Sequence, residues 1–407
     1  MTKVSSECIL ILTIEIHSLF LEEIPMRKLV TYRIINKISP IPKADYIELA
    51  HVDGWQSIVK KGDFKVGDVV LYCEVDSFIP HEVAPFLTKA GKEPEVYKGI
   101  KGERLKTMRL YKTLSQGLIL PTSLLDRTSS FPLGEDVSGE LGVIKYEEEE
   151  VQRKLPQPFK KMTGPFPSDF PKTDQERVQN LPFVFQRGIG PEEYQRYRKA
   201  HSCTYEVTEK LDGTSCSIRL AKDGKHIEVF SRNYEYLNEG AGSVYGEVAT
   251  AFNIKNRIRP WRWYDYLKSL LGIGNIGLDL PARIAGYTGL VFQGEIIGPK
   301  IQQNRYNLKE PRFFVYDIYD MNHKCYLEPQ YVKAICLDTG LLHVPTLYRD
   351  FKLGNSTLDD LLQMTDMTSC VSMLDSCQIE GLVFKANTPE RFSFKVISNK
   401  YLLDHNM

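Results

Sequence analysis

This chain of 407 residues lacks an excess of charge of either sign, clustered cysteines and uninterrupted apolar runs. Lys plus Arg and Asp plus Glu number 52 each, so bulk charge does not attract a polyanion, and any nucleic-acid surface must gather its basic residues on one face. The eight cysteines are scattered singly, without a Cys-x-x-Cys pair or a Cys/His group at metal-ligand spacing. This usage argues against a structural zinc and predicts buried, reduced thiols in an intracellular protein, cytoplasmic or nuclear.

The most apolar stretch, residues 8–21, is interrupted by Glu15 and His17 and has neither a basic start nor a small-residue cleavage site. It is too short and too charged for a membrane span and is a poor signal peptide, so we expect no membrane partner. Residues 1–25 are expected to be an extension of doubtful structure. They are an added surface strand, a disordered tail, or sequence upstream of a true start at Met26.

What the chain does contain is the run Glu209-Lys-Leu-Asp-Gly-Thr-Ser215, which follows the strand-like residues 203–208. A lysine attacks phosphorus only when it is neutral, so a site must lower its pKa with nearby positive charge, usually a metal, and with partial desolvation. Asp212 lies two residues beyond Lys210 and points the same way on an extended segment, where it can help to hold that metal or its waters. Gly213 allows a tight turn beside a bulky nucleotide. The alternative is a Lys-Asp pair that precedes a hairpin turn.

Three further segments follow in a fixed order. Residues 292–306 place Glu295 inside an apolar strand, and residues 313–319 form an aromatic strand. The last segment is Ile-Glu-Gly-Leu-Val-Phe-Lys at 379–385, followed by Phe-Ser-Phe-Lys-Val-Ile at 392–397. Four segments in order argue against a chance match in the way that one short motif does not.

Together these segments resemble the covalent nucleotidyltransferases, which comprise DNA ligases, RNA ligases and messenger RNA capping enzymes. Ser215 stands where DNA ligases and capping enzymes typically carry arginine, and only twelve residues follow Lys395, too few for the C-terminal OB domain that those enzymes usually have. Ser-Arg-Asn at 231–233 and the approach segment at 170–180 are similar to RNA ligases of the Deinococcus/Naegleria type. The resemblance covers roughly residues 27–405, with its start at Met26, and implies an OB domain at the N-terminus.

The implied fold class is α+β. An N-terminal OB-fold β-barrel in residues 26–125 is followed by a linker in residues 126–170. A nucleotidyltransferase (adenylyltransferase) domain of antiparallel sheets with flanking helices then occupies residues 171–407. Short alternating strands with a turn signal at Asp53-Gly54 fit the barrel, whereas the prolines and acidic run of the linker disfavour regular structure. Basic residues that could form a nucleic-acid face of the barrel, or could simply be solvated, are Lys60, Lys61, Lys65, Lys101, Arg104, Lys106 and Arg109. A helix-like stretch at 261–271 carries aromatic residues that we expect to pack in a core.

The resemblance also implies a role for each site residue. Lys210 is the nucleophile that attacks the α-phosphorus of ATP. Residues expected to bind the nucleotide are Arg177, Glu209, Arg232, Glu295, Phe314, Tyr316, Lys385 and Lys395. Residues expected to lie near Mg²⁺ or Mn²⁺ are Asp212, Glu295 and Glu380. Related enzymes often show Lys-x-Lys in the last segment, but Ser393 stands two residues before Lys395, so the second charge comes from Lys385 or Lys400, or is not needed.

The ring that stacks on adenine can be predicted from strand geometry. Along an uninterrupted strand, Phe314, Tyr316 and Ile318 share one face, and the residues between them share the other. Tyr316, just before Asp317, matches the family's stacking aromatic, and Phe314 is the second choice. The alternative is that both rings are core residues.

The resulting interpretation is an ATP-dependent RNA ligase that adenylylates itself, transfers AMP to a 5′-phosphate end, and seals that end to a 3′-hydroxyl with release of AMP. We expect a monomer whose partner is nucleic acid, either RNA or a mixed RNA/DNA nicked duplex. A GTP-dependent capping guanylyltransferase and an RNA-binding protein with a decayed ligase fold are the alternatives. No kinase or phosphatase motif is visible, so the ends must arrive as 5′-phosphate and 3′-hydroxyl.

Overall fold

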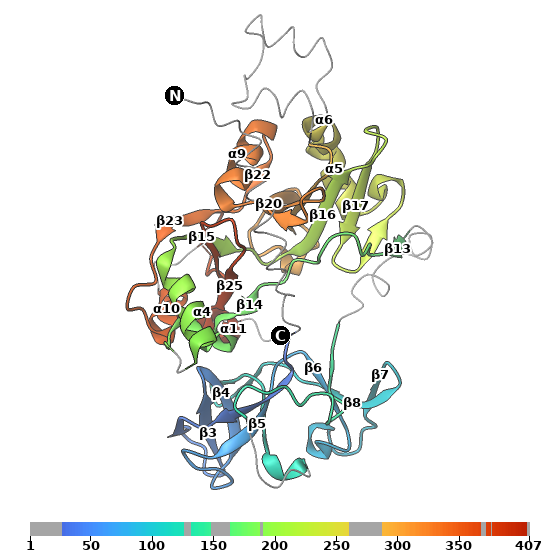
Figure 1. The fold of residues 1–407 in the computed structure, drawn as a ribbon. Helices are drawn as coiled ribbons and strands as arrows, with labels where there is room; N and C mark the ends of the chain where they lie inside the picture. The colour runs from blue at the N-terminus through green and yellow to red at the C-terminus, as the bar shows by residue number, and fades with distance from the viewer. Residues whose placement is uncertain are drawn as a thin grey trace, which may run out of the picture.

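The computed structural model describes residues 27–125, 132–147, 163–187, 190–259, 287–367, 372–375 and 377–404. The expectations for residues 1–25 and for the helix-like stretch with Trp261, Trp263 and Tyr264 lie outside these ranges. The N-terminal strands form the lower part of the molecule as drawn in Figure 1, and the later strands and helices form the upper part.

The N-terminal part is built from short antiparallel strands, as the alternating pattern predicts. Its sheets have the orders β1-β5-β11, β2-β3-β4 and β12-β6-β8-β7, and β9 pairs with β10 in a separate hairpin. The strands are β1 (Val30–Ile34), β2 (Lys37–Pro40), β3 (Ile47–Val52), β4 (Trp55–Lys60), β5 (Val69–Cys73), β6 (Ser77–Pro80), β7 (Glu95–Tyr97), β8 (Ile100–Arg104), β9 (Met108–Leu110), β10 (Thr113–Ser115), β11 (Leu118–Pro121) and β12 (Ile144–Lys145). Asp53 and Gly54, with φ of 45° and 81°, form the predicted turn between β3 and β4.

Part of the predicted linker belongs to this barrel. Val137, Leu141 and Val143 are buried in its core, and β12 pairs with β6. Turn residues dominate this stretch, but burial of its spaced apolar side chains contributes more stabilising free energy than ordering the turns costs. At the other end, β13 (Thr163–Pro165) pairs with β18 of the C-terminal part. The predicted linker limits of 126–170 are therefore too wide.

The C-terminal part contains two sheets. One has eight strands in the order β13-β18-β17-β16-β19-β20-β21, with β22 paired to β20, and the other has the order β14-β25-β24-β15-β23. Their strands are β14 (Glu176–Arg177), β15 (Tyr205–Lys210), β16 (Thr214–Leu220), β17 (Ile227–Ser231), β18 (Tyr234–Tyr236), β19 (Leu290–Ile297), β20 (Arg312–Asp320), β21 (Cys325–Tyr326), β22 (Leu342–His343), β23 (Thr346–Phe351), β24 (Gly381–Ala386) and β25 (Ser393–Ile397). Most pairings are antiparallel, as expected, and β14–β25 and β20–β22 are parallel.

Helices flank both sheets. The α-helices are α4 (Pro191–Ser202), α5 (Val244–Ala251), α6 (Ile254–Ile258), α9 (Pro329–Thr339), α10 (Leu358–Asp366) and α11 (Asn399–Asp404). Short 3₁₀ turns are η1 (Pro85–Leu87), η2 (Thr122–Leu124), η3 (Val178–Asn180), η4 (Pro182–Val184), η5 (Asn238–Gly240) and η6 (Gln302–Asn304). Apolar residues of α5, α6 and α9 pack on the eight-stranded sheet, and those of α4 and α10 pack on the five-stranded sheet. Thr357 and Asp360 fix the start of α10 by capping each other's backbone N–H groups.

A β-bulge interrupts β20 and changes which residues share a face. The register with β19 shifts between Gln293, which faces Asp317, and Gly294, which faces Val315, so Tyr316 has no direct partner. Beyond this point the alternation is reversed, and Ile318 packs in the same core cluster as Val315. The prediction that Ile318 shares a face with Tyr316 is therefore wrong.

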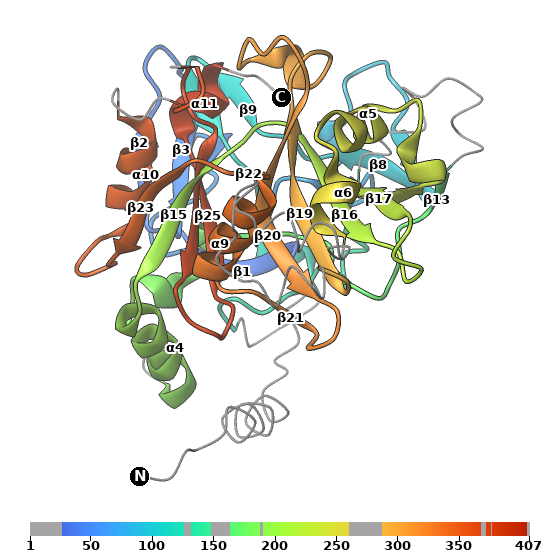
Figure 2. The same cartoon turned by 90° about the horizontal axis from the view of Figure 1, so that it is seen from above.

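The two parts of the molecule meet along a seam of specific contacts. Trp55 Nε1 donates to Asn180 Oδ1 at 3.0 Å. Leu114 of β10 packs with Tyr401 and Leu402 of α11, and Arg109 donates to a backbone carbonyl at the end of that helix. Figure 2 shows β9 beside α11 at the top of the view. The C-terminal helix thus connects the barrel to the sheets of the C-terminal part.

Candidate active site

A cavity of about 270 Å³ opens beside the end of β15, and its lining comes from both sheets of the C-terminal part. Seven of the residues expected at the site from the sequence line it. These are Glu209, Lys210, Arg232, Glu295, Tyr316, Lys385 and Lys395.

Lys210 is the last residue of β15, and its ammonium group faces an acid across the neighbouring strand. Nζ donates to Glu380 Oε1 at 2.7 Å, because Lys210 pairs in register with Gly381, the residue that follows Glu380. Burial alone lowers the pKa of Lys210, but Glu380 and Glu295 outweigh burial and the net pKa is raised. In this state the amine is a protonated ion-pair partner, and it must lose a proton before it can attack.

Glu295 lies on β19 opposite Ser215 of β16. Burial raises the pKa of Glu295 to about 8; Lys210 opposes this effect, and Glu380 and Asp212 add to it. Carboxyl groups that repel one another in a cavity are stabilised by an added cation. The electrostatics of the site therefore favour the binding of positive charge.

Asp212 is held by side chains that the sequence analysis did not single out. Its backbone N–H donates to the Tyr306 hydroxyl at 2.9 Å, and its carboxylate accepts from the Tyr401 hydroxyl at 2.7 Å and from Arg305 at 3.5 Å. The Arg305 guanidinium lies 4.5 Å from the centre of the Tyr401 ring. These contacts fix the turn that follows the nucleophile.

The predicted metal residues are not assembled as direct ligands of one ion. Among the residues that the structure describes, no three His, Cys, Asp or Glu side chains are placed to hold a metal together. Asp212 is turned toward Tyr401, whereas Glu380 Oε2 is buried and accepts no hydrogen bond within the described ranges. Mg²⁺ keeps several of its waters in most protein sites, so an arrangement of spaced acids fits a hydrated divalent cation.

Tyr316 lines the cavity at the position of the bulge in β20. Its hydroxyl is 3.3 Å from Ser215 Oγ. Lys385 lies 5.6 Å from the centre of its ring and donates to its backbone carbonyl. Lys385 also donates to Asp317 at 2.9 Å, and Arg391 donates to the other oxygen of that carboxylate at 2.8 Å. Although burial raises the pKa of Asp317, Arg391 and Lys385 outweigh it and hold the pKa at about 2.

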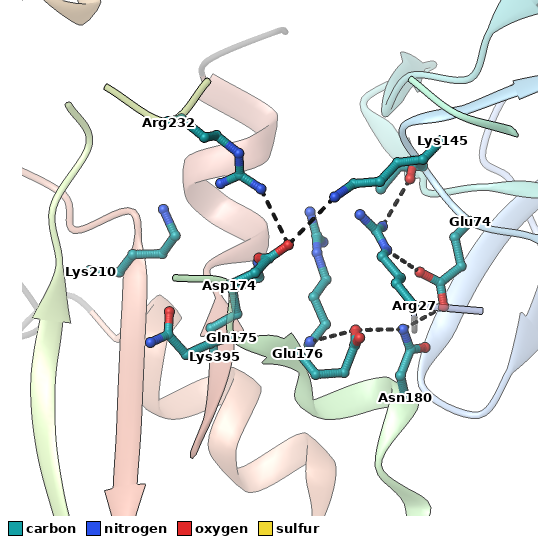
Figure 3. A network of polar contacts seen from close by, with 12 residues as sticks. Arg27, Glu74, Lys145, Asp174, Gln175, Glu176, Asn180, Lys210, Arg232 and Lys395 are labelled. Atoms are coloured by element: carbon teal, nitrogen blue, oxygen red, sulfur yellow. Dashed lines mark hydrogen bonds and ion pairs between the residues drawn. The ribbon is translucent and has the colours of Figure 1, made fainter. Parts of the chain in front are cut away.

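A second carboxylate, Asp174, brings together cations from both parts of the molecule (Figure 3). It accepts from Lys395 at 3.2 Å and from Arg232 at 3.3 Å, and Lys145 of β12 lies 3.8 Å away. Burial opposes ionisation of Asp174, but these three cations hold its pKa well below the usual range. The carboxylate therefore lies between Lys395 and Arg232 as a counter-ion that both share.

Two of the residues expected to bind the nucleotide do not line the cavity. Phe314 is buried in an apolar cluster with Leu211 and Tyr306, so the structure does not bring this second-choice ring to the nucleotide cavity. Arg177 lies at the seam, with its guanidinium 5.3 Å from the centre of the Trp55 ring. Its NH1 atom is buried and has no hydrogen-bond partner within the described ranges.

Glu209 lies at the cavity but faces the segment before β24. Burial raises the pKa of Glu209, and its Oε2 accepts from the Met373 backbone N–H at 3.3 Å. Its Oε1 is buried without a hydrogen-bond partner in the described part of the chain. A buried, unpaired carboxyl oxygen beside a cavity is suited to accept a hydrogen bond from a ligand amine.

Asp174 and Arg305 lie within residues 170–180 and 292–306, two of the segments that carry the sequence resemblance. Their closeness in sequence to the motif residues could have indicated that they belong to the site. Tyr401 carries no such signal. It follows the last motif and belongs to a short helix whose contacts with Asp212 arise only on folding.

Comparison with known proteins identifies what the chain resembles. A family profile described as RNA ligase matches residues 204–397, and a profile described as an OB-fold domain matches residues 29–122. A solved structure of a Naegleria gruberi RNA ligase mutant with ATP and Mn is 35% identical with a TM-score of 0.69, over 93% of this chain and 99% of that chain. A mutant of the same protein with AMP and Mn gives the same values, and the protein with PPi gives 35% identity and a TM-score of 0.68 over the same shares. No curated protein matches the chain.

In the described ranges, no helix has the length and apolar character needed to cross a bilayer.

Proposed function

We propose that this chain, which belongs to the RNA ligase family, joins a 3′-hydroxyl to a 5′-phosphate through AMP carried on Lys210. The observation that carries the proposal is the position of Lys210. Its Nζ is 2.7 Å from Glu380 in a cavity that Glu295 and Tyr316 also line. These are the nucleophile, the acids and the aromatic ring that the reaction requires. Structures of the Naegleria gruberi protein with ATP and with AMP support adenylylation as its chemistry.

The reaction has three steps. Neutral Lys210 Nζ bonds to the α-phosphorus of ATP as the bond to pyrophosphate breaks. The AMP then passes to the 5′-phosphate of a nucleic-acid strand, which frees the lysine. In the last step a 3′-hydroxyl attacks the phosphorus of the strand's 5′-phosphate. The hydroxyl proton is lost to solvent, and AMP leaves.

The side chains of the cavity position the nucleotide for these steps. We place Tyr316 against the adenine face, Glu209 at its amino group and Glu295 at a ribose hydroxyl. Lys395 and Arg232 bind phosphate oxygens once those oxygens replace the Asp174 carboxylate between them. Lys385 donates to Asp317 and to the backbone carbonyl of Tyr316. It therefore stabilises the position of Tyr316 as well as lining the cavity.

Mg²⁺ or Mn²⁺, when bound, neutralises the phosphate charge and competes for the carboxylates that hold Lys210 protonated. Asp212 and Glu380 are the acids that would meet its waters. The buried, unpaired Oε2 of Glu380 is the structural feature that fits this role. Arg177 pairs in register with Lys395, and its NH1 atom is buried without a hydrogen-bond partner within the described ranges, so it is proposed to bind the outer phosphates.

The finer organisation follows from the same contacts. We propose that the OB domain extends from residue 27 to about residue 147 and that the nucleotidyltransferase domain begins near residue 163. The protein is proposed to act as a monomer inside the cell, in cytoplasm or nucleus, on RNA or mixed nicked duplexes.

The test of the function starts with labelled ATP and Mg²⁺ or Mn²⁺. A protein–AMP adduct that survives denaturation is expected with wild type, and none with Lys210→Ala. Lys210→Arg should also fail, because a guanidinium stays protonated and cannot attack. A full-strength adduct in Lys210→Ala, or labelling by GTP but not ATP, contradicts the proposal. Sealing of a nicked RNA duplex by wild type completes the test.

A further inference from the structure

The hairpin of β9 and β10 lies outside the cavity and presents large apolar side chains to solvent. Met108, Leu110 and Tyr111 are 53%, 40% and 58% exposed. Residues 105–115 contain three basic residues and no Asp or Glu. A cationic surface with an exposed aromatic ring and a thioether complements a polyanion that carries flat apolar bases. A purely apolar partner would leave the cations unpaired, and a purely acidic partner would leave the ring and the thioether in water.

The turn of this hairpin has an unusual backbone for its residues. Tyr111 and Lys112 have φ of 48° and 61°, the left-handed values that two-residue hairpin turns usually reserve for Asn-Gly. Within the described ranges, neither side chain has a hydrogen-bond or ion-pair partner that would offset this strain. Strained residues with no internal partner are characteristic of binding surfaces.

The hairpin is also connected to the nucleophile. Strand alternation places Arg109 and Leu114 on the face that contacts α11, so Met108 and Leu110 point away from it. Tyr401, which packs with Leu114, donates to Asp212, two residues beyond the nucleophilic lysine. A nucleic-acid strand that lies along the hairpin therefore passes beside α11, the helix that contacts the turn after Lys210.

We infer that the β9–β10 hairpin is a docking surface for the nucleic-acid strands to be joined, with Tyr111 against a base and Lys106 and Lys112 against phosphates. The inference rests on the proposed function, since it assigns the surface that holds the ligase's substrate. The nucleic-acid surface on the barrel and the ATP cavity are then two separate sites, because no hairpin residue lines the cavity.

The decisive variant is Tyr111→Asn combined with Lys112→Gly. It replaces the strained pair by the residues that this turn prefers, so its melting temperature should equal or exceed that of wild type. Formation of the labelled AMP adduct should be unchanged. Affinity for a fluorescent nicked RNA duplex, measured by anisotropy, should fall about tenfold or more, and the slope of log affinity against log salt should fall by about one.

A matched control removes an exposed aromatic ring and an exposed lysine elsewhere on the barrel. Phe86→Asn with Lys89→Ala does this in a segment that also carries Glu82 and Glu93, and it should leave affinity within about twofold of wild type. Unchanged affinity in the hairpin variant, or an equal loss in the control, overturns the docking surface. Failure of wild type to form the adduct overturns the proposed function instead.

Discussion

Tyr316 is the residue whose role depends most directly on local backbone geometry. Its ring lines the cavity at the bulge in β20, and its hydroxyl lies 3.3 Å from Ser215 Oγ. We expect Tyr316→Ala to raise the KM for ATP in adduct formation by an amount equivalent to about 1–3 kcal/mol, the usual worth of base stacking. Tyr316→Phe keeps the ring and should be nearly neutral.

The neighbouring ring provides the control. Phe314 is buried with Leu211, so Phe314→Leu should lower the melting temperature yet leave the KM for ATP unchanged. If Tyr316→Phe were as harmful as Tyr316→Ala, the hydroxyl rather than the ring would be the binding group, and the stacking assignment would be wrong.

Asp317 allows a prediction about acid stability. Its folded pKa of about 2 lies below the ordinary value of 3.8, so it contributes stability that is fully present above about pH 5 and is lost as pH falls toward 2. The shift corresponds to about 2 kcal/mol. Asp317→Asn leaves Lys385 and Arg391 without their counter-ion and should cost about 3–5 kcal/mol at neutral pH.

Urea unfolding at several pH values between 5 and 3 checks the Asp317 prediction. The variant should lose less stability than wild type across this interval, because the titrating carboxyl has been removed. Parallel curves for the two proteins would show that Asp317 does not titrate there. Asp169→Asn is a suitable control, since this carboxylate is exposed and pairs with a single arginine, Arg219.

At this scale the sequence predicted the motif residues better than their partners. Lys210, Glu295 and Lys395 meet at the cavity because each lies at a defined place on a strand, although the strand order places β24 beside β15 and so differs from the order of the motifs. Asp174 and Asp317 were not identified as partners of the cavity lysines. Ion pairs between residues so far apart along the chain depend on tertiary packing, which no local pattern reports.

Among the elements, α11 has the clearest mechanical position. Tyr401 on this helix donates to Asp212, while Tyr401 and Leu402 pack against Leu114 of the barrel. We expect Tyr401→Phe to release the Asp212 carboxylate without opening a cavity. The rate of adduct formation should fall several-fold, and the Mn²⁺ concentration for half-maximal rate should rise, because Asp212 no longer holds one orientation toward the metal's waters.

A tyrosine at the opposite end of β15 from Lys210 separates this positioning role from general stability. Tyr205 OH donates to the Ala200 carbonyl at 2.7 Å, away from the nucleophile turn. Tyr205→Phe should lower the free energy of unfolding by about 1 kcal/mol and leave the Mn²⁺ dependence unchanged. Equal Mn²⁺ curves for Tyr401→Phe and wild type would show that the tyrosine is only a packing residue.

Element boundaries show where sequence patterns fail. Residues 137–145 were predicted as linker because turn residues dominate the stretch, yet three apolar side chains suffice to dock it on the barrel. Alternation along β20 failed at Ile318, since one extra residue in the strand reverses the faces. Both errors arise from burial and register, which are set by partners elsewhere in the chain.

For the whole molecule, the seam determines whether the barrel and the catalytic sheets behave as one unit. Asn180 is its central residue (Figure 3). Its amide donates to Glu176 at 2.9 Å and to Glu74 of the barrel, and its Oδ1 accepts from Trp55. Burial raises the pKa of Glu74, although Arg27 opposes this by pairing with it at 2.8 Å. The seam therefore joins two acids through one neutral amide.

Asn180→Asp tests this coupling with no change of size. The introduced carboxyl still accepts from Trp55, but it repels Glu74 and Glu176 and forfeits two charge-assisted hydrogen bonds worth roughly 1.5–3 kcal/mol each. In wild type, urea unfolding followed by Trp fluorescence and by far-UV circular dichroism should give coincident curves. In the variant the fluorescence change should come at lower urea, because the seam around Trp55 opens before the sheets unfold. Lowering the pH protonates Glu74, whose pKa is raised by burial, and should bring the curves back together. Asn355→Asp changes an exposed site, and its two unfolding curves should coincide at both pH values. Separated curves in Asn355→Asp, or coincident curves in Asn180→Asp at neutral pH, would contradict the prediction. The domains would then be coupled through α11 and Leu114 instead.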